Sequence, residues 1–444
     1  MIERDAAGRK IDMKYLENFH ELKSLTRKQK FFLLSLIPIY FIVIGLMAQP
    51  IQEIIPGMIA IIREPDFLIT DYFVVGGVGA ALINAGVLTL MSIGIIYCMG
   101  MDMDGHTITS SFLMFGFSLF GKNILNIWAI LAGVYLYASY HRASMRRYIY
   151  ICLYGTSLSP IITQMMQMGS GPLPLRLMLT LGVGLVIGFV LPPLSTHVHY
   201  AHMGYSLYNV GFAAGIIATV IVSIKKSFGM EVESRLIWST GYSQMFALLL
   251  LLLFGCMIIC GVAVGGKGIF ESYKRILQTY GISGADYLKD EGGATTVFNM
   301  GINGLFATCF ILAVGGVLNG PTICGIFTVA GFASTGKHLR NIAPIMAGVY
   351  LASFTKKWSI SDPSPLLALL FSTTLAPVAG EFGVLAGLAA GFLHSSVALN
   401  VGILYGGMNL YNNGFAGGIV AIFMVSVLQS VRDRRARARG GLSL

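Results

Sequence analysis

Two lysines, Lys122 and Lys337, each follow the pattern Gly-Phe-x3-Gly inside a glycine-rich apolar stretch. A lysine at the end of a membrane helix commonly extends its ammonium group to the lipid–water interface. The repetition of the pattern at two places also fits an inward-facing pair, which would favour an anionic or strongly dipolar solute. The residues alone leave both interpretations open.

The other candidate binding residues also come as matched pairs, close to the ends of short apolar segments. They are Asp104, Thr107, Asn126, Asn209, Asn319, Thr322, Asn341 and Asn412. Asp104 and Asn319 precede short segments, and these residue types are good helix N-caps. Asn209 and Asn412 stand before Gly-Phe-Ala helices in the same way. Either these residues only cap helices, or four helix N-termini direct partial positive charge at one central site.

Glu381 lies inside an apolar stretch, and its counterpart in the other copy is the neutral Gln164. A carboxylate within a membrane is costly and is a candidate proton or cation site, unless a loop falls at this position. The three imidazoles of His197, His199 and His202 could bind a transition metal, but the second copy has no histidine there. We therefore expect no metal site, no cofactor and no catalytic residue set. Phosphate-loop and nucleophile-elbow motifs do not occur in the sequence.

The strongest pattern in the sequence is an internal repeat. Residues 105–136 align without a gap to residues 320–351, with 16 identities in 32 positions. Residues 207–215, Leu-Tyr-Asn-Val-Gly-Phe-Ala-Ala-Gly, match residues 410–418 at a different offset, as expected if loops vary in length. The predicted organisation is an N-terminal segment 1–24, a repeat 25–225, a loop 226–235, a repeat 236–430 and a basic tail 431–444.

Composition places both repeats in a membrane. The chain is 55% hydrophobic and only 11% charged, with a mean hydropathy of +0.74. Long apolar runs occur at 31–48, 73–100, 177–191 and 245–265, each long enough or nearly long enough to cross a bilayer as a helix. We predict an all-α polytopic bundle of two homologous repeats. The segments 107–121 and 322–336 are short for a crossing, and 194–209 is polar enough to predict irregular or re-entrant backbone.

Charge predicts the orientation of the chain. Basic residues cluster before the first span at 23–30 and after the last span from residue 431, so we expect both termini in the cytoplasm and an even number of crossings. The basic loop 141–147 has only a weakly basic counterpart at 356–357, which favours inverted over parallel repeats. Short arginine runs after a span are topology signals, so we expect the lipid bilayer and no nucleic acid as partner. A homo-oligomer remains open.

The duplicated Asn/Asp-Gly-x-Thr-Ile, Gly-Phe-x3-Gly-Lys and Leu-Tyr-Asn-x-Gly-Phe-Ala-x-Gly motifs resemble a bacterial family of integral membrane proteins without an assigned activity. The resemblance covers nearly the whole chain and implies the bacterial cytoplasmic membrane. The layout and Tyr411-Asn-Asn-Gly414 also resemble, distantly, urea-transporter-type channels. Repeats with interrupted helices favour a transporter or channel-like facilitator for a small polar or anionic solute, with its site between the repeats. A membrane-embedded enzyme acting on a lipid or buried peptide is the alternative, and it would need clustered titratable groups.

Overall fold

The computed structural model describes residues 3–4, 10–11, 25–66, 69–167, 172–230 and 235–440, with the backbone alone at 3–4, 10–11 and 435–440. These residues form an all-α polytopic bundle, as predicted, with only four two-residue strands among them. β1 (Glu3–Arg4) pairs antiparallel with β2 (Lys10–Ile11), and β3 (Ile69–Thr70) pairs parallel with β4 (Leu236–Ile237). Apart from β1 and β2, the predicted segment 1–24 lies outside the described residues.

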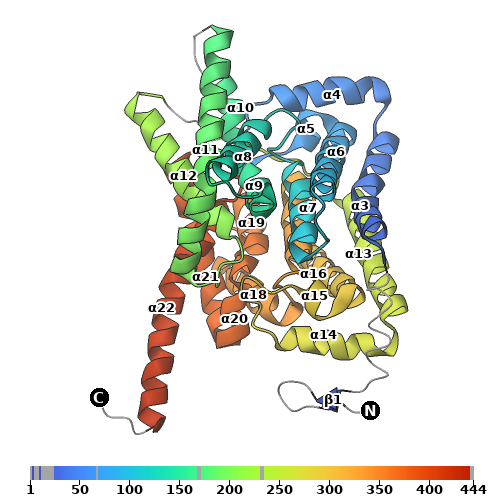
Figure 1. Cartoon of the computed structure of the whole chain (residues 1–444), viewed down its shortest axis with the longest axis vertical. Helices are drawn as coiled ribbons and strands as arrows, with labels where there is room; N and C mark the ends of the chain where they lie inside the picture. Colours follow the sequence, from blue (N-terminus) through green and yellow to red (C-terminus); the bar gives the residue numbers. More distant parts are fainter. Residues whose placement is uncertain are drawn as a thin grey trace.

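Each half of the chain contains a similar order of helices (Figure 1). The helices of the first half are α3 (Arg27–Ala48), α4 (Ile51–Arg63), α5 (Tyr72–Val75), α6 (Gly77–Cys98), α7 (Gly105–Phe117), α8 (Trp128–Tyr140), η1 (Met145–Arg147), α9 (Ile149–Gly155), η2 (Thr156–Leu158), α10 (Ser159–Gln167), α11 (Leu173–His202) and α12 (Asn209–Ser227). Those of the second half are α13 (Ser243–Gly265), η3 (Gly266–Gly268), α14 (Ile269–Gln278), α15 (Tyr287–Asp290), α16 (Gly292–Ala313), α17 (Gly320–Phe332), α18 (Leu339–Ser353), α19 (Pro363–Phe371), η4 (Ser372–Leu375), α20 (Ala376–Phe382), α21 (Val384–Val401), η5 (Gly402–Tyr405) and α22 (Asn412–Gly440).

Nine helical segments of the described chain are long and apolar enough to cross a membrane. The runs predicted at 31–48 and 245–265 lie in α3 and α13, and the run at 177–191 lies in α11. The run at 73–100 contains two helices, α5 and α6, because helical geometry is interrupted at Gly77, whose φ of +83° suits glycine. The first predicted boundary, at residue 225, falls in the last turn of α12, and the boundary at 430 falls inside α22.

One prediction about the backbone was wrong for residues 194–202 and correct for residues 203–208. The polar stretch 194–209 is helical through His202, even though α11 contains Pro192 and Pro193. Only residues 203–208 leave the helix, beginning with Met203 in the left-handed region at φ 51°. The backbone groups of α11 make their hydrogen bonds within the helix. Its polar side chains therefore do not interrupt it.

One matched pair of elements lies at opposite ends of the molecule. α4 follows α3, and α14 follows α13, yet α4 and α14 lie at opposite ends of the molecule (Figure 1). In the orientation of Figure 1, α4 and α5 mark the upper end, and α14, α15 and the end of α22 mark the lower end. Lower and upper are used below in this sense.

Glycine allows helix pairs inside each half to pack with their backbones in contact. α8 packs on α11 and α18 packs on α21. A Cβ atom added at Gly188 would lie 2.1 Å from the carbonyl oxygen of Ile130, and one at Gly391 would lie 2.0 Å from that of Ile345. In the sequence Gly188 follows Gly184 and Gly391 follows Gly387 at the spacing Gly-x3-Gly, which allows the backbones of neighbouring helices to touch.

Contacts between the halves form the centre of the bundle. α7 packs on α17, and α12 packs on α22. Gly215 of α12 faces Phe415, and Gly418 of α22 faces Phe212 in the same way. In the repeat alignment these are the same contact made twice with the partners exchanged. Such reciprocal contacts are the signature of a two-fold relation between the surfaces that meet.

Candidate functional site

Both matched lysines are buried in the centre of the molecule. Lys122 is 1% exposed and Lys337 is 0% exposed, so neither reaches the surface of the protein. The Nζ atom of Lys337 donates hydrogen bonds to the Tyr208 hydroxyl at 2.5 Å and to the Thr373 hydroxyl at 2.8 Å. The Nζ atom of Lys122 lies 5.1 Å from the centre of the Phe117 ring and has no hydrogen bond with the described residues. No ion pair to either lysine is found in the described part of the chain.

Each lysine lies on a turn that follows a short helix. The side-chain amide of an asparagine on a neighbouring helix holds this turn by hydrogen bonds. The Asn84 amide donates to the carbonyl oxygens of Ser118 and Lys122, at 2.7 and 2.8 Å. The Asn299 amide donates to the carbonyl oxygens of Ala333 and Lys337 at the same two distances, 2.7 and 2.8 Å. These carbonyls follow the C-terminal ends of α7 and α17, where helix carbonyls lack partners. Asn84 and Asn299 were not among the predicted residues, although they occupy matching positions in the two repeats.

The predicted residues Asn126 and Asn341 also fasten these turns. Asn126 accepts a hydrogen bond from the backbone of Asn123 and donates to the carbonyl oxygen of Gly121. Asn341 makes the corresponding contacts to the backbone of His338 and to the carbonyl oxygen of Gly336. Both asparagines therefore position the lysine turns, and neither lines the two central cavities described below.

Hydroxyl and aromatic side chains from both halves surround the two lysine turns. Tyr208 and Tyr411 precede α12 and α22, and their ring centres are 5.5 Å apart. Next to them, the backbone N–H of Leu207 donates to the carbonyl of Thr374, and the N–H of Leu410 donates to the carbonyl of Ser157. These two hydrogen bonds are again one contact made twice with exchanged partners.

Asn209 and Asn412 lie where α12 and α22 meet. A Cβ atom at Gly414 would be 3.0 Å from the Cα atom of Gly211, so the first turns of the two helices touch. The two asparagines therefore sit at one junction and not at opposite ends of the molecule.

The prediction that these asparagines cap the helices was wrong. Asn209 is the first helical residue of α12, and its amide donates to the carbonyl of Ser195 while its oxygen pairs with His202. Asn412 donates to the carbonyl of Ala398, and its side-chain oxygen has no partner among the described residues. Carbonyl groups of the preceding helices accept hydrogen bonds from both amides, so the side chains do not cap their own helices.

Two cavities flank the junction. The lower cavity has a volume of ≈ 210 Å³ and is lined by residues including Asn209, Tyr208, Tyr411, Arg147 and His106. Ser283, between α14 and α15, also lines it, which places this cavity toward the lower end. Its volume equals that of about seven water molecules in the liquid.

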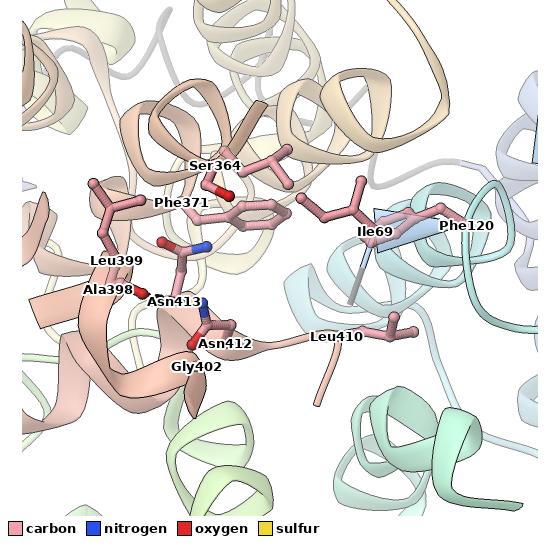
Figure 2. Close-up of a pocket in the computed structure, with 11 residues that line it drawn as sticks. Ile69, Phe120, Ser364, Phe371, Ala398, Leu399, Gly402, Leu410, Asn412 and Asn413 are labelled. Carbon is pink, nitrogen blue, oxygen red and sulfur yellow. Dashed lines mark hydrogen bonds between the residues drawn. The ribbon is translucent and has the colours of Figure 1, made fainter. Parts of the chain in front are cut away.

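The upper cavity has a volume of ≈ 70 Å³ and is lined by residues including Asn412, Asn413, Phe371 and Ile69 of β3 (Figure 2). In Figure 2 the amides of Asn412 and Asn413 lie beside each other below the Phe371 ring. The side-chain oxygens of both amides are buried and have no partner among the described residues.

The two cavities are built from matched parts of the repeats. Leu207, Asn209 and Tyr154 in the lower cavity correspond to Leu410, Asn412 and Phe371 in the upper one. The chief difference is charge, because Arg147 of the lower cavity corresponds to Ser364 of the upper. Neither lysine lines either cavity, but Tyr208 and Phe332 of the lower cavity contact Lys337, and Phe120 of the upper cavity lies in the turn that carries Lys122.

The N-termini of α7 and α17 do not contribute to this centre. Asp104 and Asn319 cap these helices through the backbone of Thr107 and Thr322, at 2.8 and 3.2 Å, as predicted. However, the first residue of α7 contacts Asp286, just before α15, and the first residue of α17 contacts Asp71, just before α5. Figure 1 shows α15 toward the lower end and α5 toward the upper end. The hypothesis that four helix N-termini converge on one site is therefore wrong.

Carboxylates from the opposite half occupy these two N-termini. The N–H of Gly105 donates to Asp286 at 3.1 Å, and the N–H of Gly320 donates to Asp71. Asp71 and Asp286 occupy matching positions before α5 and α15. The partial positive charge at each helix start is thus used to hold the halves together.

Glu381 lies at the end of α20, near the lower end of the molecule, and lines neither central cavity. Arg432 of α22 forms an ion pair with it at 2.5 Å, and the Tyr205 hydroxyl donates to it at 2.5 Å. Its counterpart Gln164 instead donates to the backbone carbonyl of Asp66.

A buried carboxyl that sequence reasoning missed lies next to one lysine turn. Asp66 is 0% exposed and accepts hydrogen bonds from the Tyr72 hydroxyl at 2.7 Å, the Thr163 hydroxyl at 2.9 Å and the Asn126 amide at 3.2 Å. Burial, only partly offset by these hydrogen bonds, raises the pKa of Asp66 to about 7. The residue lies in a short connection after α4, outside every apolar run, so the sequence carried no signal for its burial.

Comparison with known proteins identifies one family. The model of the family described as protein of unknown function (DUF1576) matches residues 51–227 and 266–430. The two matches fall on the two halves of the chain and together cover most of it. No curated protein and no solved structure matches the chain.

Proposed function

The chain belongs to the DUF1576 family, and we propose that it is an alternating-access transporter for a small anion. In this proposal the two halves are inverted repeats, and the transport path runs through the lower cavity, the central junction and the upper cavity. The observation that carries it is the pair of buried lysines between two matched cavities that point toward opposite ends of the molecule.

The lysines supply the argument for an anion. An ammonium group buried without a counter-charge is destabilising, and a bound anion removes much of that cost. Lys337 has only neutral hydroxyl partners, and Lys122 has none among the described residues. Arg147 at the lower cavity adds a third cation along the same path. A small anion that approaches the junction would therefore be attracted from the lower side and met by ammonium groups at the centre.

Inversion is supported by the placement of matched elements. α4 and α14 lie at opposite ends, as do the starts of α7 and α17 (Figure 1). α7 and α8 have 13 residues each, or about 20 Å of helix, which is less than the ~30 Å hydrocarbon core of a bilayer. We propose that α7–α8 and α17–α18 are re-entrant hairpins that enter from opposite faces, each carrying one lysine at its turn.

The difference between the two halves defines the state of the transporter. Lys337 is engaged with Tyr208 and Thr373, whereas the matching contacts of Lys122 with Tyr411 and Thr156 are not made. The lower cavity is also three times larger than the upper one, ≈ 210 against ≈ 70 Å³. In inverted repeats, exchanging the conformations of the two halves generates the opposite-facing state. In that state Lys122 would bind Tyr411 and Thr156, Lys337 would be released, and the upper cavity would open.

The lower end is assigned to the cytoplasm. Arg147 lines the lower cavity in the basic loop, and α22, with its basic end, also finishes at this end (Figure 1). Basic segments next to membrane helices stay on the cytoplasmic side, so the larger cavity faces inward. The cytoplasmic membrane is the expected location.

The proposal is tested with the full chain reconstituted in liposomes on a solid-supported membrane. Concentration jumps of sodium nitrate, chloride, acetate and phosphate are compared with an equal jump of sodium gluconate. We expect a protein-dependent current with at least one small anion. Lys337→Met and Lys122→Met should each reduce this current roughly 10- to 100-fold, because one charge-assisted contact contributes about 1.5–3 kcal/mol. Lys267→Met, at an exposed lysine, is the matched control and should leave the current unchanged. Equal currents in all three variants would refute a role for the buried lysines.

A further inference from the structure

The Asp66 cluster (Asp66, Tyr72, Asn126 and Thr163) has the composition of a proton-binding site. All three side-chain partners of the carboxyl are neutral, and no ion pair to Asp66 is found among the residues that the structure describes. A buried carboxylate without a cation is stabilised by binding a proton. Tyr72 and Thr163 carry hydroxyl groups, which can accept as well as donate, so the cluster can hold either protonation state.

The second repeat has no such carboxyl. In the gapless alignment that pairs Asp71 with Asp286, Asp66 corresponds to Gly281. A Cβ atom at Gly281 would lie 2.0 Å from the carbonyl oxygen of Gly336 and 2.8 Å from the Asn341 amide. The second repeat therefore closes this space with backbone, while the first repeat fills it with a titratable side chain. The matched framework does not require a carboxyl here, because the other copy fastens its lysine turn without one.

The cluster is not sealed from the outside of the bundle. Asn126 and Thr163 also line a cavity of ≈ 620 Å³ between α4, α8, α10 and α11. Asn123 lines the same cavity, and its side-chain nitrogen is buried without a hydrogen-bond partner among the described residues. A water molecule that reached this amide would stand next to the cluster and could deliver a proton.

We infer that Asp66 binds and releases the proton that is coupled to anion movement, which makes the proposed transporter a proton–anion symporter. The inference rests on the proposed function. The step is a simple protonation: the carboxylate takes one proton to form the neutral acid, and no other bond is made or broken.

Asn126 connects this proton to the lysine turn. Its amide nitrogen donates both to Asp66 and to the carbonyl of Gly121, the residue before Lys122. An amide nitrogen can only donate, so it loses an acceptor when the proton occupies the oxygen that it faces. Protonation therefore alters the hydrogen bonds that hold the turn carrying Lys122. Proton binding and anion binding are then linked through one turn.

Other charged or titratable groups surround the cluster. On the sides of α4, β4 and α11 these are Arg63, Glu64, Arg235 and Arg176. Glu64 is paired with Arg235 at 2.6 Å, so it is not the unpaired acid of this region. Thr163 and Gln164 from α10 are neutral.

The first test follows thermal unfolding of the purified full chain against pH, and it requires no transport. A carboxyl whose pKa is higher in the folded than in the unfolded state stabilises the fold at low pH, and this stability is lost as pH rises. The melting temperature of the wild type should therefore fall between about pH 4 and about pH 7 and then level off for this group. Asp66→Asn should remove this fall, and Glu64→Gln, the matched control in the same segment, should keep it.

Identical profiles for wild type and Asp66→Asn would overturn the assignment. If Asp66→Asn fails to fold, Tyr72→Phe replaces it: loss of a donor to the carboxylate should move the fall to higher pH, and an unmoved profile would overturn the assignment. Stabilisation by sodium chloride but not by choline chloride at about pH 8, lost in Asp66→Asn, would show a sodium site and also overturn it.

The second test measures coupling in liposomes with nitrate as probe and an internal pH dye. Wild type and Glu64→Gln should acidify the lumen when nitrate enters, and Asp66→Asn should lose this acidification. Nitrate currents without any acidification in the wild type would refute the symport. One proton that moves with one monovalent anion carries no net charge, so transport can acidify the lumen without a current. Absence of both a current and acidification with every anion probe would refute the proposed function, while the pH profile of unfolding would still report on Asp66.

Discussion

Replacing Gly188 by alanine should separate two helices that the structure holds in backbone contact. The added Cβ atom would lie 2.1 Å from the carbonyl oxygen of Ile130 and 2.7 Å from the backbone nitrogen of Val134. Ordinary contact begins at 3.4 Å, so α8 and α11 would have to move apart by about 1 Å. A gap of that size forfeits roughly a quarter to a half of the dispersion attraction of each affected contact.

The expected cost is about 1–3 kcal/mol of folding free energy, the range found for overpacked interiors. The same helix offers a matched control, because no atom lies within 4 Å of a Cβ atom at Gly182. Alanine favours a helix over glycine by about 0.5–1 kcal/mol, so Gly182→Ala should leave the protein as stable as the wild type or more stable. The two substitutions change the same atoms on one helix and should act in opposite directions.

The assay is the melting temperature of the purified chain in detergent, together with the yield of monodisperse protein. Gly188→Ala should lower both, and Gly188→Leu should lower them further. Gly391→Ala should behave like Gly188→Ala, since its Cβ atom would lie 2.0 Å from the carbonyl oxygen of Ile345. Equal melting temperatures for Gly188→Ala and Gly182→Ala would refute the close contact of α8 with α11.

Two further predictions concern the centre and the orientation. Tyr208→Phe should lower the folding free energy by about 1 kcal/mol, because it removes a buried hydrogen bond of Lys337. Tyr411→Phe should cost less, since the Tyr411 hydroxyl makes no hydrogen bond with the described residues; equal losses of melting temperature would contradict the asymmetry of the two halves. A reporter that is active only in the cytoplasm, fused after Leu444, should give signal because the basic segments anchor both ends there; a stable but silent fusion would reverse the orientation.

The sequence predicted the structure correctly where a residue type has one main structural role, as apolar residues have in spans and Asp or Asn at helix starts. Apolar runs identified α3 and α13, and the Asp104 and Asn319 patterns identified the starts of two short helices. These features depend on neighbours within a few positions along the chain. The burial of Lys122 and Lys337 agrees with the inward alternative, which their repetition had suggested.

The sequence was misleading where distant partners decide the outcome. Asn209 could have capped α12, but the carbonyl of Ser195 and the ring of His202 bind its side chain. Asp66 could not be distinguished from an exposed loop residue until Thr163 and Asn126 were placed around it. These contacts join residues 7 to 97 positions apart, which is beyond the one-turn spacing that a capping pattern reports.

The packing of α7 on α17 also has a consequence for synthesis of the protein. Thr109 donates to the carbonyl of Gly331, which lies 222 residues later in the chain. Ribosomes add about 5–20 residues per second, so the first partner waits roughly 10–45 s for the second. During that interval the hydroxyl can donate to the carbonyl of Gly105 in its own helix, and the open face of α7 must be accommodated by water, by lipid or by the insertion machinery. Completion of the centre is therefore timed by translation of the second half, and a stall between the halves would leave an inserted but unfinished first half exposed to membrane proteases.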